Sequence, residues 1–294
     1  MRDFFNLVKQ RKIIFDGGMG SILISKGLRQ GEVPEKWILE KHEVVQQIHK
    51  EYIEAGADVI ETNTFGGSRI KLSFQELGKK VKEINQTAAK IALEILPQDK
   101  YLAGDIGPIG KFMKPLGTLE PEEVEDTFIE QATILAEAGV HLFIIETMYD
   151  LNEALIALKA VKKVCNLPVI VSLTYKSTPK GFFTIMGNDI SQSFKQLQEQ
   201  GADIVGANCT LSSPEMLGLV KQIRKSVTVP VIAQPNAGNP VLEGDKTVYK
   251  ETAEEFVHNA VLMYENGVNI IGGCCGTTPE FIEKLYESVN KIQG

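Results

Sequence analysis

Apolar and polar positions along the chain repeat in a fixed order, in which a helical stretch ending in Glu-x-Gly is followed by a short apolar run. The four helix-ending glycines are Gly56, Gly139, Gly201 and Gly267. Glycine suits the left-handed position that ends a helix, and the run after each one has the length and composition of a buried strand. The pattern therefore predicts four units of a helix followed by a strand.

Further apolar runs fill the gaps between these units, at residues 12–16, 101–106, 168–175 and 229–234. Several intervening helical stretches open with start signals, namely Ser213-Pro214-Glu215, Thr252 followed by Glu255, and Thr278-Pro279-Glu280. Eight continuously apolar strands that alternate with helices predict a (β/α)8 TIM barrel, formed by a single domain over residues 1–294. A doubly wound sheet would also explain the alternation, but it rarely has eight units with so regular a repeat.

Composition and charge exclude several classes of function. The chain of 294 residues is 43% hydrophobic and carries a net charge of −7, without a basic cluster. Nucleic acids and anionic membrane surfaces attract concentrated Lys and Arg, so neither is an expected partner. No apolar stretch approaches the roughly 18 residues of a membrane span, and no apolar signal-peptide core follows the first charges. We therefore expect a soluble, cytoplasmic protein whose cysteines are reduced thiols.

Three of the four cysteines stand where two predicted strands end. Cys209 follows Gly201 by eight residues and Cys275 follows Gly267 by eight, so they are equivalent positions on the sixth and eighth strands. Alternate strands of a barrel contribute to one inward layer, so the two side chains can approach each other at the barrel mouth. Cys274 would point the other way on a regular strand, and the neighbouring glycines allow the backbone to leave β geometry there. Three thiolates at one point indicate a soft metal, most plausibly zinc.

The remaining cysteine and the histidines are predicted to lie away from this point. Cys165 precedes the fifth strand at the opposite end of the barrel, His141 starts the fourth strand there, and the others lie on helical stretches (His42, His49 and His258). The metal would therefore keep an open position, as catalytic zinc does. Two other interpretations are weaker: buried cysteines can simply pack as small apolar residues, and the glycine-rich loop could hold a phosphate.

Motifs along nearly the whole chain resemble those of the homocysteine S-methyltransferase family. They are Asp16-Gly-Gly-Met-Gly20, Glu61-Thr-Asn-Thr-Phe-Gly66, Gly104-Asp-Ile-Gly-Pro108, Glu146-Thr147, Asn208-Cys209, Pro235-Asn-Ala-Gly238 and Gly272-Gly-Cys-Cys-Gly-Thr277. Within the family, the chain looks most like the homocysteine-binding module of cobalamin-dependent methionine synthase. Ser21, where a threonine is common, is a mild departure.

The resemblance implies a Zn²⁺ ion held by the three cysteines Cys209, Cys274 and Cys275, with the homocysteine sulfur as the added ligand. It implies that Asp16 and Glu146 hold the amino-acid end of the substrate. Backbone amides at Gly17 and in the Thr62–Asn63 turn would take its carboxylate. Without substrate, the amide oxygen of Asn236 would occupy the open zinc position.

The resemblance also implies a methyl donor that the chain does not itself hold. A cobalamin-binding Asp-x-His-x-x-Gly motif is missing from the sequence. A separate corrinoid protein, either a subunit or the detached cobalamin-binding domain of a larger enzyme, would then present methylcobalamin over the barrel mouth, where we expect an exposed apolar or mixed surface. The alternative enzyme would methylate homocysteine from S-methylmethionine, S-adenosylmethionine or betaine without a second protein. A non-catalytic zinc-binding scaffold is a further, weaker alternative.

Overall fold

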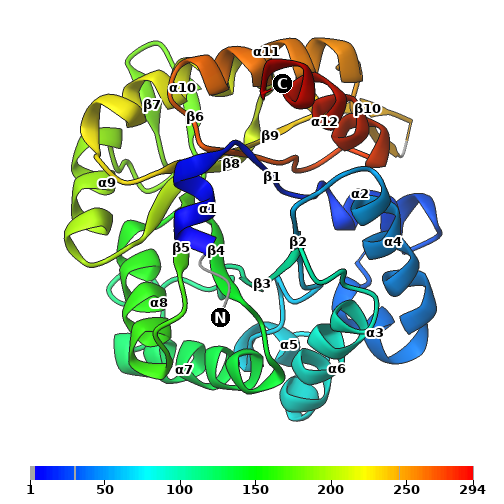
Figure 1. Ribbon diagram of the computed structural model, residues 1–294. Coiled ribbons are helices and arrows are strands. Elements are labelled where there is room, and N and C mark those ends of the chain that lie inside the picture. The colour runs from blue at the N-terminus through cyan, green and yellow to red at the C-terminus, as the bar shows by residue number, and fades with distance from the viewer. Residues whose placement is uncertain (1–3, 30, 245, 294) are drawn as a thin grey trace.

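The structure is a computed structural model that describes residues 4–29, 31–244 and 246–293. Eight parallel strands form a barrel with helices around it, as Figure 1 shows in a view along the barrel axis. The barrel strands are β1 (Ile13–Ile14), β2 (Val59–Glu61), β3 (Tyr101–Ile106), β4 (Leu142–Met148), β5 (Val169–Leu173), β8 (Ile204–Ser212), β9 (Val231–Asn236) and β12 (Ile270–Ile271).

The sheet closes on itself. Strand β1 pairs with β12 through Ile13 and Ile270, and just beyond β1 Phe15 forms a parallel bridge to Val59 of β2. The predicted TIM barrel is therefore confirmed, because a doubly wound sheet would leave its two outer strands unpaired. The first and last barrel strands are two residues long, shorter than the apolar runs that predicted them.

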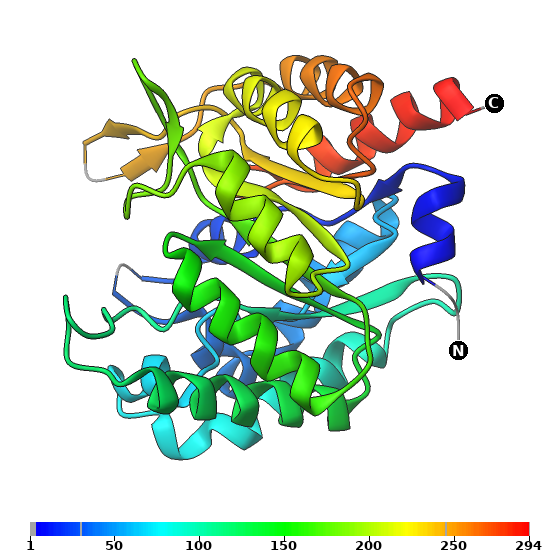
Figure 2. The same cartoon turned by 90° about the vertical axis from the view of Figure 1, so that its left-hand side faces the viewer.

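Helices cover the outside of the barrel (Figures 1 and 2). They are α1 (Phe4–Gln10), α2 (Met19–Ser25), α3 (Trp37–Glu40), α4 (His42–Glu54), α5 (Arg69–Ser73), α6 (Val81–Leu93), α7 (Pro121–Ala138), α8 (Leu151–Val164), α9 (Ile190–Glu199), α10 (Ser213–Ser226), α11 (Ala253–Glu265) and α12 (Pro279–Gln293), with 3-10 turns η1 (Pro34–Lys36) and η2 (Gly78–Lys80). None of the helices in the described ranges is long and apolar enough to cross a membrane.

The local signals read from the sequence set the ends of these helices. Gly56, Gly139, Gly201 and Gly267 all have φ between 88° and 101°, the left-handed conformation expected after a helix. Helix α11 begins with a capping box between Thr252 and Glu255. Helix α10 begins one residue earlier than its signal suggested, because Ser212 makes the capping box with Glu215.

An apolar core fills the barrel interior, and α1 closes its amino-terminal end. The inward side chains of this core include Ile13, Val59, Leu142, Ile144, Ile170, Ile204, Ile232 and Ile270. Phe4 of α1 packs edge-on against Tyr101 with ring centroids 5.1 Å apart. The interior of the lower barrel is thus filled with side chains, and in this fold ligands bind at the carboxyl-terminal ends of the strands.

Two β-hairpins extend from this carboxyl-terminal end, on the side opposite to α1 (Figure 2). They are formed by β6 (Lys176–Thr178) with β7 (Gly181–Phe183), and by β10 (Val241–Glu243) with β11 (Lys246–Val248). The sequence analysis did not predict them. Each lies in a connection between a barrel strand and the next helix, where the barrel fold leaves the chain free to vary.

Candidate metal centre and substrate site

A polar layer lies directly above the apolar barrel core. Side chains alternate along a strand, so the residue two positions after an inward apolar residue also points inward. Val59 is followed in this way by Glu61, Ala103 by Asp105, Ile144 by Glu146, Ile170 by Ser172 and Ile232 by Gln234. The barrel mouth therefore changes within one layer from aliphatic to hydrogen-bonding and ionisable groups.

Carboxylates dominate this layer. One oxygen each of Glu61, Asp105 and Glu146 lie within 4.8 Å of one another. Asp16, just after β1, joins them because its Oδ2 accepts a hydrogen bond from the Glu61 amide at 2.9 Å. No Lys or Arg forms an ion pair with any of the four in the part of the chain that the structure describes. Asp16 Oδ1 and Asp105 Oδ1 have no hydrogen-bond partner among the described residues.

Burial makes these carboxyl groups weak acids. It raises the pKa of Glu61 to about 7, although the Gln234 amide, which donates to Glu61 Oε1 at 2.8 Å, opposes the shift. Burial and the neighbouring carboxylates also raise the pKa values of Asp16, Asp105 and Glu146. A cation placed among them would stabilise the ionised carboxylates and so lower these pKa values, which makes the layer suited to an ammonium group.

The three thiols predicted at the mouth lie together at its edge. The sulfurs of Cys209, Cys274 and Cys275 are all within 4.8 Å of one another, and Cys209 Sγ lies 3.8 Å from Cys275 Sγ. The backbone departs from strand geometry in both segments that carry these cysteines, within β8 and after β12. Cys209 has φ of 60°, a strained value for a residue with a Cβ, and the register of β8 against β9 shifts after Asn208.

The second segment, which carries Cys274 and Cys275, is the Gly272–Thr277 loop beyond the end of β12. The Cys274 amide donates to the Pro235 carbonyl at 2.9 Å, and the Cys275 carbonyl accepts from the Ala237 amide at 3.0 Å. Gly276 has φ of 84°, and a Cβ there would lie 2.3 Å from the Tyr249 ring. The expected departure from β geometry beside the adjacent cysteines is therefore observed.

The thiols differ in acidity because they hydrogen-bond to one another. Hydrogen bonds from Cys209 and Cys274, assisted by the Tyr249 hydroxyl, lower the pKa of Cys275 to about 3. Hydrogen bonding to its sulfur neighbours and burial raise the pKa of Cys274. A hydrogen bond from Cys274 lowers the pKa of Cys209, but its bond to Cys275 and burial outweigh this and raise it to about 12. A thiolate therefore exists in the cluster at neutral pH, and a metal ion would replace the remaining thiol protons.

The other expected substrate residues lie around the same mouth. Asn236, at the end of β9, is buried, and its Oδ1 has no partner among the described residues. The Thr62 amide already donates to the Ala103 carbonyl at 2.9 Å, so within the Thr62–Asn63 turn only the Asn63 amide remains for a substrate carboxylate. Gly17 follows Asp16 at the end of β1, and a Cβ there would lie 2.7 Å from Thr277 Oγ1. This position therefore has no room for a side chain.

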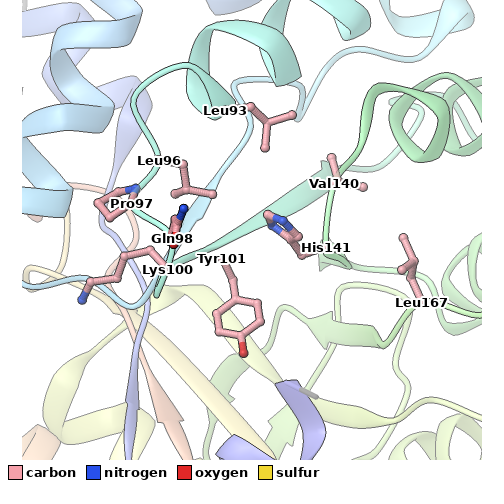
Figure 3. A pocket seen from close by; sticks show the side chains of 9 residues that line it. All are labelled: Leu93, Leu96, Pro97, Gln98, Lys100, Tyr101, Val140, His141 and Leu167. Atoms are coloured by element: carbon pink, nitrogen blue, oxygen red, sulfur yellow. The ribbon is translucent and has the colours of Figure 1, made fainter. Parts of the chain in front are cut away.

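The residues expected at the opposite end are found there. Cys165 ends α8, and His141 precedes β4 and accepts a hydrogen bond from the Leu102 amide at 2.9 Å. His141 also lines a hollow of about 540 Å³ with Lys100 and Tyr101 (Figure 3). The hollow adjoins the amino-terminal ends of β3 and β4, and its lining residues include no carboxylate or thiol, in contrast to the opposite end of the barrel.

Four members of the polar layer were not among the predicted site residues: Glu61, Asp105, Ser172 and Gln234. The signal that identifies them is the period of two along each strand, counted upward from the apolar core. Their type alone was uninformative, because acidic residues near strand ends often cap helices or pair with Lys or Arg.

Comparison with known proteins establishes the family. The family model described as homocysteine S-methyltransferase matches residues 13–289. The chain belongs to this family. The family resemblance read from the motifs is thus confirmed, and the chain is a methyltransferase by family.

Two curated relatives are methionine synthases. The chain is 30% identical to that of Mycobacterium leprae over 305 residues and 28% identical to that of Mycobacterium tuberculosis over 309 residues. These alignments cover 98% and 99% of this chain but 25% and 26% of the relatives. This chain therefore spans about a quarter of the length of these methionine synthases.

Solved structures support the fold. The metallated form of the homocysteine methyltransferase MmuM from Escherichia coli has a TM-score of 0.80 at 19% identity, with 96% of this chain and 98% of that chain covered. Its apo form has a TM-score of 0.74 at 20% identity, with 96% and 97% covered. The carboxyl transferase domain of Rhizobium etli pyruvate carboxylase has a TM-score of 0.55 at 15% identity, with 99% of this chain and 49% of that chain covered, and shares the architecture more distantly.

Proposed function

We propose that this barrel transfers a methyl group to the thiol of homocysteine and so produces methionine, with the thiol bound as a thiolate on a Zn²⁺ ion. The observation that supports this most strongly is that the three cysteine sulfurs lie close to a layer of carboxylates that form no ion pair among the described residues: Asn208 Nδ2 contacts both Glu146 and Cys274 Sγ. One part of the site suits a metal-bound sulfur, and the other suits an ammonium group. Homocysteine carries both groups on one short chain.

The sulfur positions fit a tetrahedral zinc site. Zinc–sulfur bonds of about 2.3 Å at tetrahedral angles place two ligand sulfurs about 3.8 Å apart. This agrees with the 3.8 Å between the sulfurs of Cys209 and Cys275. Cys274 is the third ligand, and the fourth position is left for the substrate. When bound, the ion keeps the substrate thiol deprotonated at neutral pH.

The charge of the ligand set favours a reactive sulfur. Three thiolates and one Zn²⁺ carry a net charge of −1, and the homocysteine thiolate brings it to −2. Such an electron-rich centre withdraws little density from the bound sulfur, which stays nucleophilic toward a methyl electrophile. In the absence of substrate, the unpaired Oδ1 of Asn236 is the protein atom suited to the open position.

The protein's own residues orient the amino-acid end. We assign the substrate ammonium to Asp16 and Glu146, with Glu61 and Asp105 completing the anionic layer around it. The substrate carboxylate would be taken by the backbone amides at Gly17 and Asn63. Fixing both ends of the substrate leaves its sulfur at the mouth, where a donor can reach it in line.

X-ray absorption at the zinc edge, with and without homocysteine, tests the proposal. A fourth sulfur in the coordination shell, gained on addition of homocysteine, is the expected result. A non-catalytic scaffold would show a complete shell of protein ligands that homocysteine does not change. That outcome would refute the methyl-transfer proposal.

We propose that the methyl donor is methylcobalamin, carried by a corrinoid protein or a cobalamin-binding domain. Exposed apolar side chains occur in connections around the mouth: Ile24 (65% exposed), Phe112 (47%), Leu116 (69%), Ile185 (63%) and Leu242 (73%). They follow four different barrel strands and so surround the opening. Exposed apolar groups distributed around an active site are suited to a large, transient partner rather than to a small donor.

A donor panel separates this from the alternative enzyme. Homocysteine and zinc-loaded protein would be combined with methylcobalamin, S-methylmethionine, S-adenosylmethionine or betaine. We expect methionine from methylcobalamin alone. A double variant, Leu116→Asp with Leu242→Asp, should keep activity with free methylcobalamin and lose it with the carrier protein. Turnover of a small sulfonium or betaine donor would favour the self-sufficient enzyme. The reduced thiols of such a site are consistent with the cytoplasmic location proposed from the sequence.

A further inference from the structure

Asn208 connects the two halves of the site. It lies on β8 immediately before Cys209, and its side chain is fully buried. Its Oδ1 accepts hydrogen bonds from the Thr147 amide and from Ser172 Oγ, both at 2.8 Å. Because two donors surround Oδ1, the orientation of the amide is fixed, and its N–H groups must point the other way.

Those N–H groups face two hydrogen-bond acceptors from different parts of the site. Asn208 Nδ2 donates to the Glu146 carboxylate, and it also lies 3.9 Å from Cys274 Sγ, within hydrogen-bonding range of a sulfur. A third contact, to Thr147 Oγ1 at 2.7 Å, holds it in the same plane. One uncharged side chain thus contacts the carboxylate assigned to the substrate ammonium and a thiol assigned to zinc.

We propose that Asn208 is a positioning residue, which fixes Glu146 and Cys274 relative to each other and so couples zinc binding to the binding of the amino-acid end of homocysteine. The inference rests on the proposed function. Its physical basis is that a hydrogen bond to a metal-bound thiolate orients the ligand and disperses its charge. A hydrogen bond to a buried carboxylate is also among the stronger ones.

Three variants separate positioning from a general structural role. Asn208→Ala removes all of the contacts. Asn208→Asp keeps the size and the Oδ1 acceptor but places an oxygen against Glu146 and Cys274. Ser172→Ala is the matched control, because it removes one hydrogen bond to the same Oδ1 and leaves both N–H contacts in place.

Zinc affinity would be measured by competition with a chelator, and homocysteine binding by the change in the visible spectrum of the Co²⁺-substituted protein. We expect zinc affinity to fall about 10- to 100-fold in both Asn208 variants, since outer partners of metal ligands commonly contribute that much. Homocysteine affinity should fall in parallel, and Ser172→Ala, which keeps both N–H contacts of Asn208, should lose much less of either affinity.

The proposal is overturned if both Asn208 variants match Ser172→Ala, or if only one of the two affinities falls. Should Asn208→Ala fail to fold, the isosteric Asn208→Asp decides the question. The proposed function has its own separate failure, in which the wild-type protein gains no sulfur ligand from homocysteine. If the wild type binds homocysteine through sulfur and the Asn208 variants keep their zinc and homocysteine affinities, only the inference about Asn208 is refuted.

Discussion

Glu61→Gln should stabilise the folded protein at alkaline pH and lower its affinity for homocysteine. Glu61 ionises in the barrel interior, where burial raises its pKa from 4.5 to about 7 and its one amide partner is Gln234. At pH values between 4.5 and 7, Glu61 is therefore protonated in the folded state but ionised in the unfolded state. Stability from this group is present below pH 4.5 and is lost as the pH rises through 7.

The size of the effect follows from the shift. At 1.36 kcal/mol per unit, a shift from 4.5 to about 7 corresponds to roughly 3 kcal/mol at pH 8. This is an upper limit, because the Glu61 side chain is only partly shielded from solvent. Gln cannot ionise and still accepts the hydrogen bond from Gln234. We therefore expect the variant to gain up to roughly 3 kcal/mol over the wild type at pH 8 and about none at pH 4.

Denaturation by urea at pH 4.5, 6 and 8 measures the gain, and Glu153→Gln is the matched control. Burial also raises the pKa of Glu153 to about 7, but this residue accepts from the Ile109 amide outside the mouth. Both variants should gain stability with rising pH, whereas only Glu61→Gln should lose homocysteine affinity, by roughly tenfold for one charged hydrogen bond. A Glu61→Gln gain that does not grow between pH 4.5 and 8 would refute the reasoning.

The remaining mutational predictions concern metal binding, stability in acid, and the closure of the barrel between β1 and β2. Cys274→Ala should lose zinc and methyl transfer together, measured by metal analysis and a methionine assay, while Cys165→Ala keeps both; full activity in a zinc-free variant would end the mechanism. His49 is fully buried and its pKa is lowered by burial to about 4, so the wild type should lose roughly 3 kcal/mol as the pH falls from 6.5 to 4. Replacing it with Leu should flatten that loss in acid denaturation curves, and unchanged slopes would contradict the assignment. Asp58 binds Arg11 with both oxygens and accepts from the Ile14 amide at the closing strand pair. Asp58→Ala should therefore cost about 3 kcal/mol in urea at pH 7 without changing zinc affinity, and a loss below about 1 kcal/mol would count against it.

The barrel could be predicted because its signals are local. A glycine that ends a helix needs only its own backbone conformation, and Gly56 and Gly201 have the expected positive φ. The buried strands follow from continuous apolar runs. The β6–β7 and β10–β11 hairpins could not be predicted in the same way, since each of their strands is only three residues long, and β6 and β10 are exposed throughout and show no alternation of buried and exposed residues.

The site was predictable to the extent that it follows from barrel symmetry. Counting from the helix-ending glycines placed Cys209 and Cys275 at equivalent positions, and their sulfurs lie 3.8 Å apart. The left-handed backbone at Cys209 could not be predicted, because a cysteine rarely adopts it and no glycine marks the position. Likewise, the roles of Glu61 and Asn208 depend on contacts across the barrel, with partners up to 173 residues away in sequence.

A last prediction concerns the protons that homocysteine displaces. Before substrate binds, burial and the neighbouring carboxylates favour the protonated carboxyl groups, whereas the substrate ammonium would favour their ionised form. Binding should therefore release the thiol proton and, in addition, carboxyl protons. The extra release should be larger at pH 6, where Glu61 is protonated, than at pH 8, where it is mostly ionised.

Titration calorimetry in buffers of different ionisation enthalpy counts these protons. The free thiol also ionises partly near pH 8, so the informative comparison is with Glu61→Gln, in which the difference between pH 6 and pH 8 should shrink. An identical difference in variant and wild type would mean that the ammonium does not enter the carboxylate layer.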